Sequence, residues 1–258
     1  MGISDAPAEA MQNSTPITAY RMNLGEYQLS NPPPPTRIPS PMRRIVRHSD
    51  YNPSILVLNV ALVQLTEPIN FTGTIRPISL TGSSTQFPAG EKCWVTGWGH
   101  IGWGCGDVLL PPRTLQQLQV SLFDVSTCEK LIGRCKRWNQ PTRLCARAQD
   151  ARSGPCKGDS GGPLVCPEGN SFILAGIVSW GINCTAFPPP HPGVYSRVSV
   201  YAEWIQEVTG SAGPSAFSPA VLSAGTTPLG SLSNGLVCSC LALALIAPLL
   251  AGLLLPAL

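Results

Sequence analysis

The sequence has little charge and little histidine. Only 12% of its 258 residues are charged, its formal net charge is +3, and it contains three histidines. So small and scattered a positive charge argues against a nucleic-acid partner. Internal repeats are absent, as are the Cys/His spacings typical of zinc sites. We therefore expect neither a metal nor another cofactor.

An export signal is also missing from the first residues. Residues 1–11 have no basic start and no apolar run, so they do not form a secretory signal peptide. A myristoylation signal is excluded because Ala6 stands where Ser or Thr is required. Ten cysteines nevertheless suit an extracellular protein better than a cytosolic one. The simplest expectation is that the chain is a truncated form, has an alternative start or comes from an incomplete gene model.

Turn-forming residues are abundant. The chain has 25 glycines and 27 prolines, 43% of it is hydrophobic, and helical periodicity is scarce. This composition predicts many short strands joined by turns, with one large core or two smaller ones.

One glycine-rich segment, PCKGDSGGPL at residues 155–164, suits the display of a nucleophile. Glycines beside Ser160 would let the backbone amides of Gly158 and Ser160 point at an oxyanion. A serine hydroxyl also needs an imidazole to take its proton and a carboxylate to orient that imidazole. An isolated match of this kind is more often a surface turn with an idle serine.

Further motifs decide between these interpretations. The chain resembles the trypsin/chymotrypsin family of serine endopeptidases, in its membrane-associated prostasin/tryptase-like branch, because several motifs follow in family order: NVALVQL (59–65), CWVTGWG (93–99), LQQLQVSLFDVSTCEKL (115–131), PCKGDSGGPLVC (155–166), GIVSWG (176–181) and PGVYSRVSVYAEWI (192–205). The resemblance implies an all-β, trypsin-like double six-stranded β-barrel with a C-terminal helix. We assign residues 20–208 to this domain, with an incomplete first barrel, and residues 1–19 to an irregular N-terminal segment. The pattern of residues 198–208 predicts the helix, with Val200, Trp204 and Val208 on one face.

The catalytic base expected from the resemblance is missing. The family carries its histidine in an AAHC-type segment upstream of the catalytic aspartate, and no such segment occurs here. We interpret His48 as a structural residue and His100 and His191 as loop residues. Asn59 replaces the aspartate, a change that alone lowers turnover about ten-thousandfold in trypsin-like enzymes. Ser160 would therefore be a nucleophile without its base.

Zymogen activation is affected in the same way. In the family, a newly cleaved Ile-Val-Gly-Gly terminus pairs with the carboxylate that here is Asp159, and this chain has no such sequence. The Arg44-Ile45-Val46 segment only superficially resembles a cleavage site, and the resemblance predicts a strand there. Ser79 replaces the cysteine that tethers the propeptide. We expect burial of Asp159 to reduce stability or to raise its pKa.

The residues that would bind substrate are partly readable from the resemblance. Gly154 stands where trypsin-like enzymes place an aspartate for Arg or Lys, while Gly181 and Gly193 match the glycines that keep the pocket open. This predicts a roomy, uncharged pocket. Ser179, Trp180 and Gly181 match the strand that pairs with an extended substrate. Trp180 would equally fit a core strand. Expected partners are protein or peptide substrates and protease inhibitors.

By the same resemblance, the disulfide pairs are Cys93–Cys166, Cys128–Cys145 and Cys156–Cys184. Cys105 and Cys135 lie outside the family pattern, and either pair with each other or remain free thiols. Glycosylation sequons occur at Asn13, Asn70 and Asn183. Asn70 is the best candidate because it lies in a turn-like segment.

The C-terminal part divides into a Gly/Ser/Pro-rich linker (209–235) and an apolar tail (236–258). The tail is long enough to span a bilayer. Because no basic residue follows it, we favour a GPI signal over a retained span, with attachment at Ser223. Cys238 and Cys240 would be removed with a GPI signal, or could be palmitoylated in a span.

The expected location is the extracellular face of the plasma membrane if a signal peptide lies upstream, and otherwise the chain would be secreted or mislocalised.

Three functional hypotheses remain. The chain is part of a longer, active, surface-tethered serine endopeptidase; it is a pseudoprotease that binds substrates or inhibitors without cleaving them; or it is a product that does not fold. As written, we expect negligible peptidase activity.

Overall fold

The computed structural model describes residues 17–20, 22–29, 37–52, 54, 56–101, 106–132, 140–150, 153–181 and 192–210. Short strands dominate these residues, as the composition predicts. The predicted all-β fold is confirmed, with helices α1 (Val125–Ile132) and α2 (Ala202–Thr209) and short 3₁₀ turns between strands.

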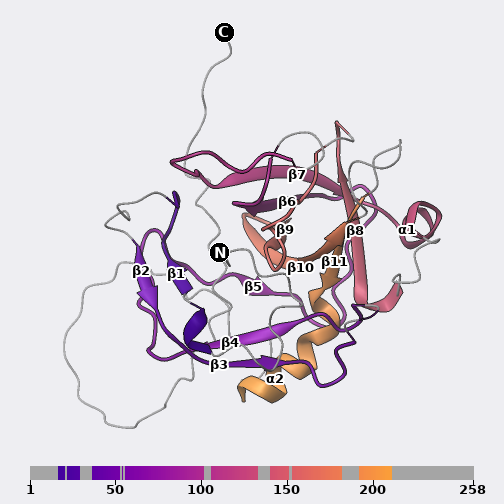
Figure 1. Cartoon of the computed structure of the whole chain (residues 1–258). Coiled ribbons are helices and arrows are strands. Elements are labelled where there is room, and N and C mark those ends of the chain that lie inside the picture. Colours follow the sequence, from indigo (N-terminus) through magenta and orange to yellow (C-terminus); the bar gives the residue numbers. More distant parts are fainter. Residues whose placement is uncertain are drawn as a thin grey trace.

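The second half of the chain forms a closed barrel of six strands (Figure 1). Around it, the strands follow the order β11–β8–β7–β6–β9–β10, and β10 pairs again with β11 to close the ring. Their bounds are β6 (Lys92–Gly97), β7 (Gln116–Leu122), β8 (Arg143–Ala148), β9 (Pro163–Glu168), β10 (Ser171–Gly181) and β11 (Gly193–Arg197).

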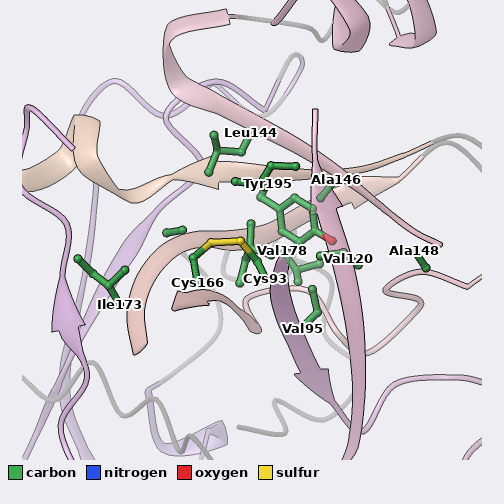
Figure 2. Close-up of a cluster of buried hydrophobic side chains, with 13 residues drawn as sticks. Cys93, Val95, Val120, Leu144, Ala146, Ala148, Cys166, Ile173, Val178 and Tyr195 are labelled. Atoms are coloured by element: carbon green, nitrogen blue, oxygen red, sulfur yellow. A yellow bond between two sulfur atoms is a disulfide. The ribbon is translucent and has the colours of Figure 1, made fainter. Parts of the chain in front are cut away.

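Alternating apolar residues explain how this barrel fills its interior. In β6, for example, Cys93 and Val95 are buried while Lys92 is exposed. The core cluster also includes Val120, Ala146 and Tyr195. Figure 2 shows the Cys93–Cys166 disulfide and the Tyr195 ring inside this cluster.

The first half of the described chain forms smaller sheets instead. Strand β1 (Met22–Leu24) pairs with β2 (Ile38–Ser40), and β3 (Met42–Arg47) pairs with β4 (Ala61–Leu65). Strand β5 (Ser79–Leu80), which contains Ser79, joins the barrel by pairing in parallel with β10. The segment Arg44-Ile45-Val46 lies within β3, so the predicted strand is present there.

Helix α2 returns to the first half of the chain and packs against it. Tyr201 and Ile205 form one buried cluster with Val60 and Leu62, beside β4 (Figure 1). The helix ends at Gly210, whose left-handed backbone (φ 64°) lets its N–H bond the Gln206 carbonyl. The last strand of the barrel therefore leads directly into an element that joins the two halves.

One detail of the predicted helix is wrong. Val200 was expected on the packed face with Trp204 and Val208, but it is 42% exposed. The first turn, η5 (Val198–Tyr201), is a 3₁₀ helix. Its tighter winding changes the period, so Tyr201 takes the inward position that a continuous α-helix would assign to Val200. Trp204 and Val208 do pack against the cluster.

Several predicted features lie outside the described residues. They are Asn13, Asn183, Cys105, Cys135, Cys184, His191, the linker beyond residue 210 with Ser223, and the tail with Cys238 and Cys240. Across the part of the chain that is described, no helix has the length and apolar character needed to cross a membrane.

Candidate functional site

The candidate nucleophile lies in the tight turn that leads from β8 to β9. Ser160 is exposed there, and the turn around it is fixed by backbone hydrogen bonds. The N–H groups of Asp159 and Gly162 donate to the carbonyls of Cys156 (3.0 Å) and Asp159 (2.9 Å). The Gly161 N–H donates to the Val178 carbonyl of β10 at 2.9 Å. The turn is thus held against β10 with the serine facing solvent.

The turn also leaves amides available beside Ser160. Among the described residues, neither the Gly158 nor the Ser160 N–H donates a hydrogen bond. Gly158 has φ +93°, a conformation that favours glycine, and a Cβ there would lie 3.1 Å from the Gly99 Cα. These are the two amides that the sequence predicts as an oxyanion hole, and no carbonyl of the described residues accepts a hydrogen bond from either.

Asp159 points inward and is held by the GWG segment. Its Oδ1 accepts the Gly99 N–H at 2.8 Å, and its Oδ2 accepts the Cys156 N–H at 2.9 Å. A Cβ on Gly97 would lie 2.0 Å from Oδ1. Burial raises the pKa of Asp159, although the two amides and the nearby His100 act in the opposite direction. The shift is in the direction expected for a buried carboxylate.

Asn59, which the resemblance predicts at the position of the family aspartate, contacts Ser179 of β10. Its Nδ2 donates to the Ser179 Oγ at 2.9 Å, and its carbonyl accepts the Ser196 hydroxyl at 2.9 Å. The structure therefore joins two predicted site residues that are 120 positions apart. Because Asn59 presents an amide donor at this point, it lacks the negative charge that would stabilise a protonated base.

The two described histidines, His48 and His100, lie in different surroundings. The imidazole of His48 packs against the rings of Tyr201 and Trp204, with centroids 6.0 and 5.1 Å away. Its Nδ1 accepts the Asp50 N–H at 3.2 Å, so both its ring and its Nδ1 have partners. The His100 backbone donates to the Lys157 carbonyl at 2.8 Å, which places it beside the nucleophile turn rather than in solvent alone.

Arg143, which the sequence reasoning missed, is buried next to Asn59 and Ser179. It is only 2% exposed at the start of β8. Its guanidinium donates to the Ser179 Oγ (3.4 Å) and to the Leu56 carbonyl, and lies 5.7 Å from the centre of the Trp180 ring. Charged residues are rarely buried, so the sequence of β8, RLCARA, does not predict that its first arginine is buried. The site thus contains a cation close to residue 59.

The predicted pocket residues are also brought together. Gly181 and Gly193 are paired in the β10–β11 ladder. A Cβ on Gly193 would lie 3.0 Å from the Tyr195 Oη and 3.2 Å from Pro155, whereas a Cβ on Gly154 would meet nothing within 4 Å. The Tyr195 hydroxyl is buried without a hydrogen-bond partner in the described part of the chain, and burial raises its pKa. Sequence reasoning did not identify Tyr195.

The backbone of residues 179–181 extends beyond the neighbouring strand. Strand β9 ends its pairing with β10 at Pro163 and Ile177, while β11 continues along the other side to Gly181. On the β9 side, no described strand pairs with Ser179, Trp180 or Gly181. Among the described residues, this side of β10 next to the Ser160 turn therefore has no strand partner.

Disulfides stabilise the surroundings of the site. Cys93–Cys166 joins β6 to β9, and Cys128–Cys145 joins α1 to β8. These are two of the three pairs expected from the sequence. Cys156 is also disulfide-bonded, but its expected partner, Cys184, is not among the described residues. Within the described ranges, no cluster of three or more His, Cys, Asp or Glu side chains could hold a metal ion.

Comparison with known proteins agrees with this geometry. The trypsin family profile matches residues 11–205. Human transmembrane protease serine 5 is 37% identical over 171 residues, which are 64% of this chain and 35% of that protein. The chain therefore spans about a third of that relative's length. The family profile, which covers most of the chain, together with the six-stranded barrel shows that the chain belongs to the trypsin family of serine proteases.

Proposed function

We propose that this chain is a trypsin-type domain that binds extended peptide segments of protein substrates or inhibitors without hydrolysing them. The observation that carries the proposal is the hydrogen bond from the Asn59 amide to Ser179, at the position where catalysis needs a carboxylate. The nucleophile and its neighbouring amides are retained, but the groups that would activate the nucleophile are not.

Hydrolysis requires removal of the Ser160 proton. A serine hydroxyl is a weak nucleophile at neutral pH, and an imidazole normally takes its proton. His48 is engaged by Tyr201 and Trp204, and none of the three histidines lies in an AAHC-type segment. The amides of Gly158 and Ser160 could stabilise an oxyanion, but little oxyanion would form.

The electrostatics around Asn59 oppose a base as well. A protonated imidazole would need an adjacent negative charge, and Asn59 is neutral. The Arg143 guanidinium, bound to the same Ser179 hydroxyl, would repel it. Supplying a histidine alone would therefore restore little activity.

Peptide binding requires neither a base nor a negative charge beside it. The free edge of Ser179–Gly181 can accept an extended peptide by strand addition, with the Ser160 turn beside it. Gly154 carries no charge and has open space beside its Cα. We therefore expect a preference for peptides whose side chain at this position is uncharged.

The relative's name supports a location at the cell surface. Transmembrane protease serine 5 is, by its name, a transmembrane protein. We propose an extracellular or membrane-associated location for this chain, and attachment through a GPI anchor at Ser223 remains part of the proposal.

A fluorophosphonate probe tests the absence of catalysis. The disulfide-bonded protein and Ser160→Ala are incubated with the probe beside an active trypsin-family protease. We expect equal background labelling of the two forms of this chain. Labelling that disappears in Ser160→Ala would overturn the proposal.

A calorimetric titration with a reactive-loop protease inhibitor that presents an uncharged residue tests peptide binding. Trp180→Ala should weaken binding, whereas Val200→Ala, on the exposed side of η5, should not. Thermal unfolding of each variant checks its folding. A correctly disulfide-bonded protein that binds no such inhibitor would contradict the binding proposal.

A second candidate is the catalytic part of a longer active endopeptidase. It is favoured by the available Gly158 and Ser160 amides, which a functioning oxyanion hole requires. The same probe, applied to a longer product that includes an upstream histidine segment, distinguishes it: Ser160-dependent labelling there would establish this candidate.

A further inference from the structure

We propose that Asn70 carries an N-linked glycan and that this glycan covers the side chain of Phe71. The proposal rests on the extracellular or membrane-associated location proposed above, but not on the catalytic state of the site. Its basis is the sequon Asn70-Phe71-Thr72 together with the way the structure presents it.

The sequon lies at the tip of an exposed but well-anchored segment. Every residue from Asn70 to Thr74 is exposed. On either side, Ile69 and Ile75 pack into the cluster formed by Met22, Leu24 and Leu65. The chain therefore leaves the core at Ile69, turns in solvent and returns at Ile75, so a large group on Asn70 would meet no packed neighbour.

The turn is stable without any contribution from the Asn70 side chain. The Thr72 N–H donates to the Ile75 carbonyl at 2.9 Å. The Thr72 hydroxyl accepts the N–H groups of Thr74 and Ile75 at 3.2 and 3.1 Å. Among the described residues, the Asn70 amide makes no hydrogen bond, so its nitrogen can be modified without loss of a structural contact.

Phe71 supplies the second observation. Its ring is 61% exposed and belongs to none of the buried clusters in the described part of the chain. A single exposed apolar side chain is common. Here it directly follows the modifiable nitrogen, and the apolar face of a sugar ring can pack on an aromatic ring. The first sugars would thus remove apolar surface from water.

The chemistry is a glycosyl transfer from a polyprenol-diphosphate oligosaccharide. The Asn70 amide nitrogen forms a bond to C1 of the first N-acetylglucosamine and loses one proton. The bond from C1 to the diphosphate oxygen breaks, and the polyprenol diphosphate leaves with the electron pair. No oxidation or reduction takes place.

To test the proposal, the full chain is expressed in mammalian cells with a cleavable secretion signal at its N-terminus. Oxidation of Cys93 and Cys166, measured by thiol alkylation, verifies entry into the secretory pathway. We expect peptide-N-glycosidase to increase mobility, and mass spectrometry after release in ¹⁸O-water to find a labelled aspartate at position 70. The Asn70→Gln variant should lose this signal, while Thr72→Ser, which preserves the sequon, should retain it. Asn13→Gln and Asn183→Gln are the matched controls and should leave it unchanged.

Unmodified Asn70 in disulfide-bonded, secreted protein would overturn the glycosylation proposal and leave the fluorophosphonate result unaffected. The covering of Phe71 is measured separately with an apolar-surface dye. Asn70→Gln should bind more dye than the glycosylated protein, and Asn70→Gln/Phe71→Ser should reverse the increase. Equal dye binding by glycosylated protein and Asn70→Gln would disprove the covering role.

Discussion

At the scale of single residues, the site combines retained and lost chemistry within one hydrogen-bonded neighbourhood. The turn that carries Ser160 bonds to Val178, and the next residue, Ser179, receives hydrogen bonds from Asn59 and Arg143. The Ser160 turn, Asn59 and the buried Arg143 are therefore connected through hydrogen bonds to neighbouring residues of β10. In the proposed function, the polarity of these groups, and not their position, prevents catalysis.

Replacing Asn59 by aspartate tests this interpretation. Aspartate would accept a hydrogen bond from the Ser179 hydroxyl and interact favourably with the Arg143 guanidinium. It would still have no imidazole to orient. We expect Asn59→Asp to leave the rate of Ser160 labelling by a fluorophosphonate unchanged within about tenfold, far below the roughly 10⁴-fold effect of this position in intact triads. A larger increase would reveal a base that we have not identified.

The buried carboxylate of Asp159 predicts a pH dependence of stability. Because burial raises its pKa in the folded state, the folded protein binds the proton more tightly than the unfolded chain does. Its contribution is therefore most favourable below the unfolded pKa of 3.8 and is lost as the pH rises through the folded pKa. The free energy of unfolding should fall by at most about 1.4 kcal/mol per pH unit in this window.

Urea titrations of the wild type and Asp159→Asn at a series of pH values measure this effect. The variant removes the titrating group, so the difference in unfolding free energy between the two proteins should change with the slope just given. A difference that is independent of pH, or that favours the wild type as the pH rises, would contradict the assigned shift.

At the scale of elements, side chains at strand and helix ends determine where the chain turns. Asp124 shows this at the start of α1. Its Oδ1 accepts the Thr127 N–H at 2.8 Å, and its carboxylate also accepts the hydroxyls of Ser126 and Thr127. These bonds cap the helix that carries Cys128, which is joined to β8 by a disulfide.

Removing this cap should destabilise the protein in a pH-dependent way. The Ser126 hydroxyl, followed by the Thr127 N–H and hydroxyl, holds the pKa of Asp124 well below its usual value. The stabilisation is therefore present above the unfolded pKa of 3.8 and is lost as the pH falls towards the folded pKa. Asp124→Ala should lower Tm modestly at pH 7, and the difference from wild type should shrink below pH 3.8, as followed by circular dichroism. Val125→Ala, at an exposed position on the same helix, is a non-titrating control whose difference from wild type should not depend on pH.

At the scale of the whole molecule, α2 connects the last barrel strand to the smaller sheets of the first half. Ile205 is 6% exposed and packs with Val60, Leu62 and Tyr201. This contact joins segments from the two halves of the chain, so the stability of the first half depends on the end of the domain.

Truncating Ile205 should therefore be costly. Ile205→Ala leaves a cavity in this cluster, and we expect the free energy of unfolding to fall by about 2–5 kcal/mol in a denaturant titration. Val200→Ala, at an exposed position close by, should change it by no more than ~0.5 kcal/mol. Similar losses for the two variants would show that α2 does not join the halves in the way described.

The sequence by itself determined the family and the all-β architecture, and it predicted Ser160 as the nucleophile and Asn59 as the replacement of the aspartate. These features depend on short, local motifs whose residue types are dictated by turn geometry and strand burial, as in the glycines around Ser160. It also identified Asn70, because a sequon is a local pattern.

Only the tertiary structure decided how distant side chains meet. It placed the Asn59 amide on Ser179, buried Arg143 beside them, and packed His48 against Tyr201 and Trp204. It also moved Val200 out of the packed face, because η5 is wound more tightly than an α-helix. Such contacts arise from barrel closure and from the return of α2, which bring together segments more than a hundred residues apart and leave no trace in local composition.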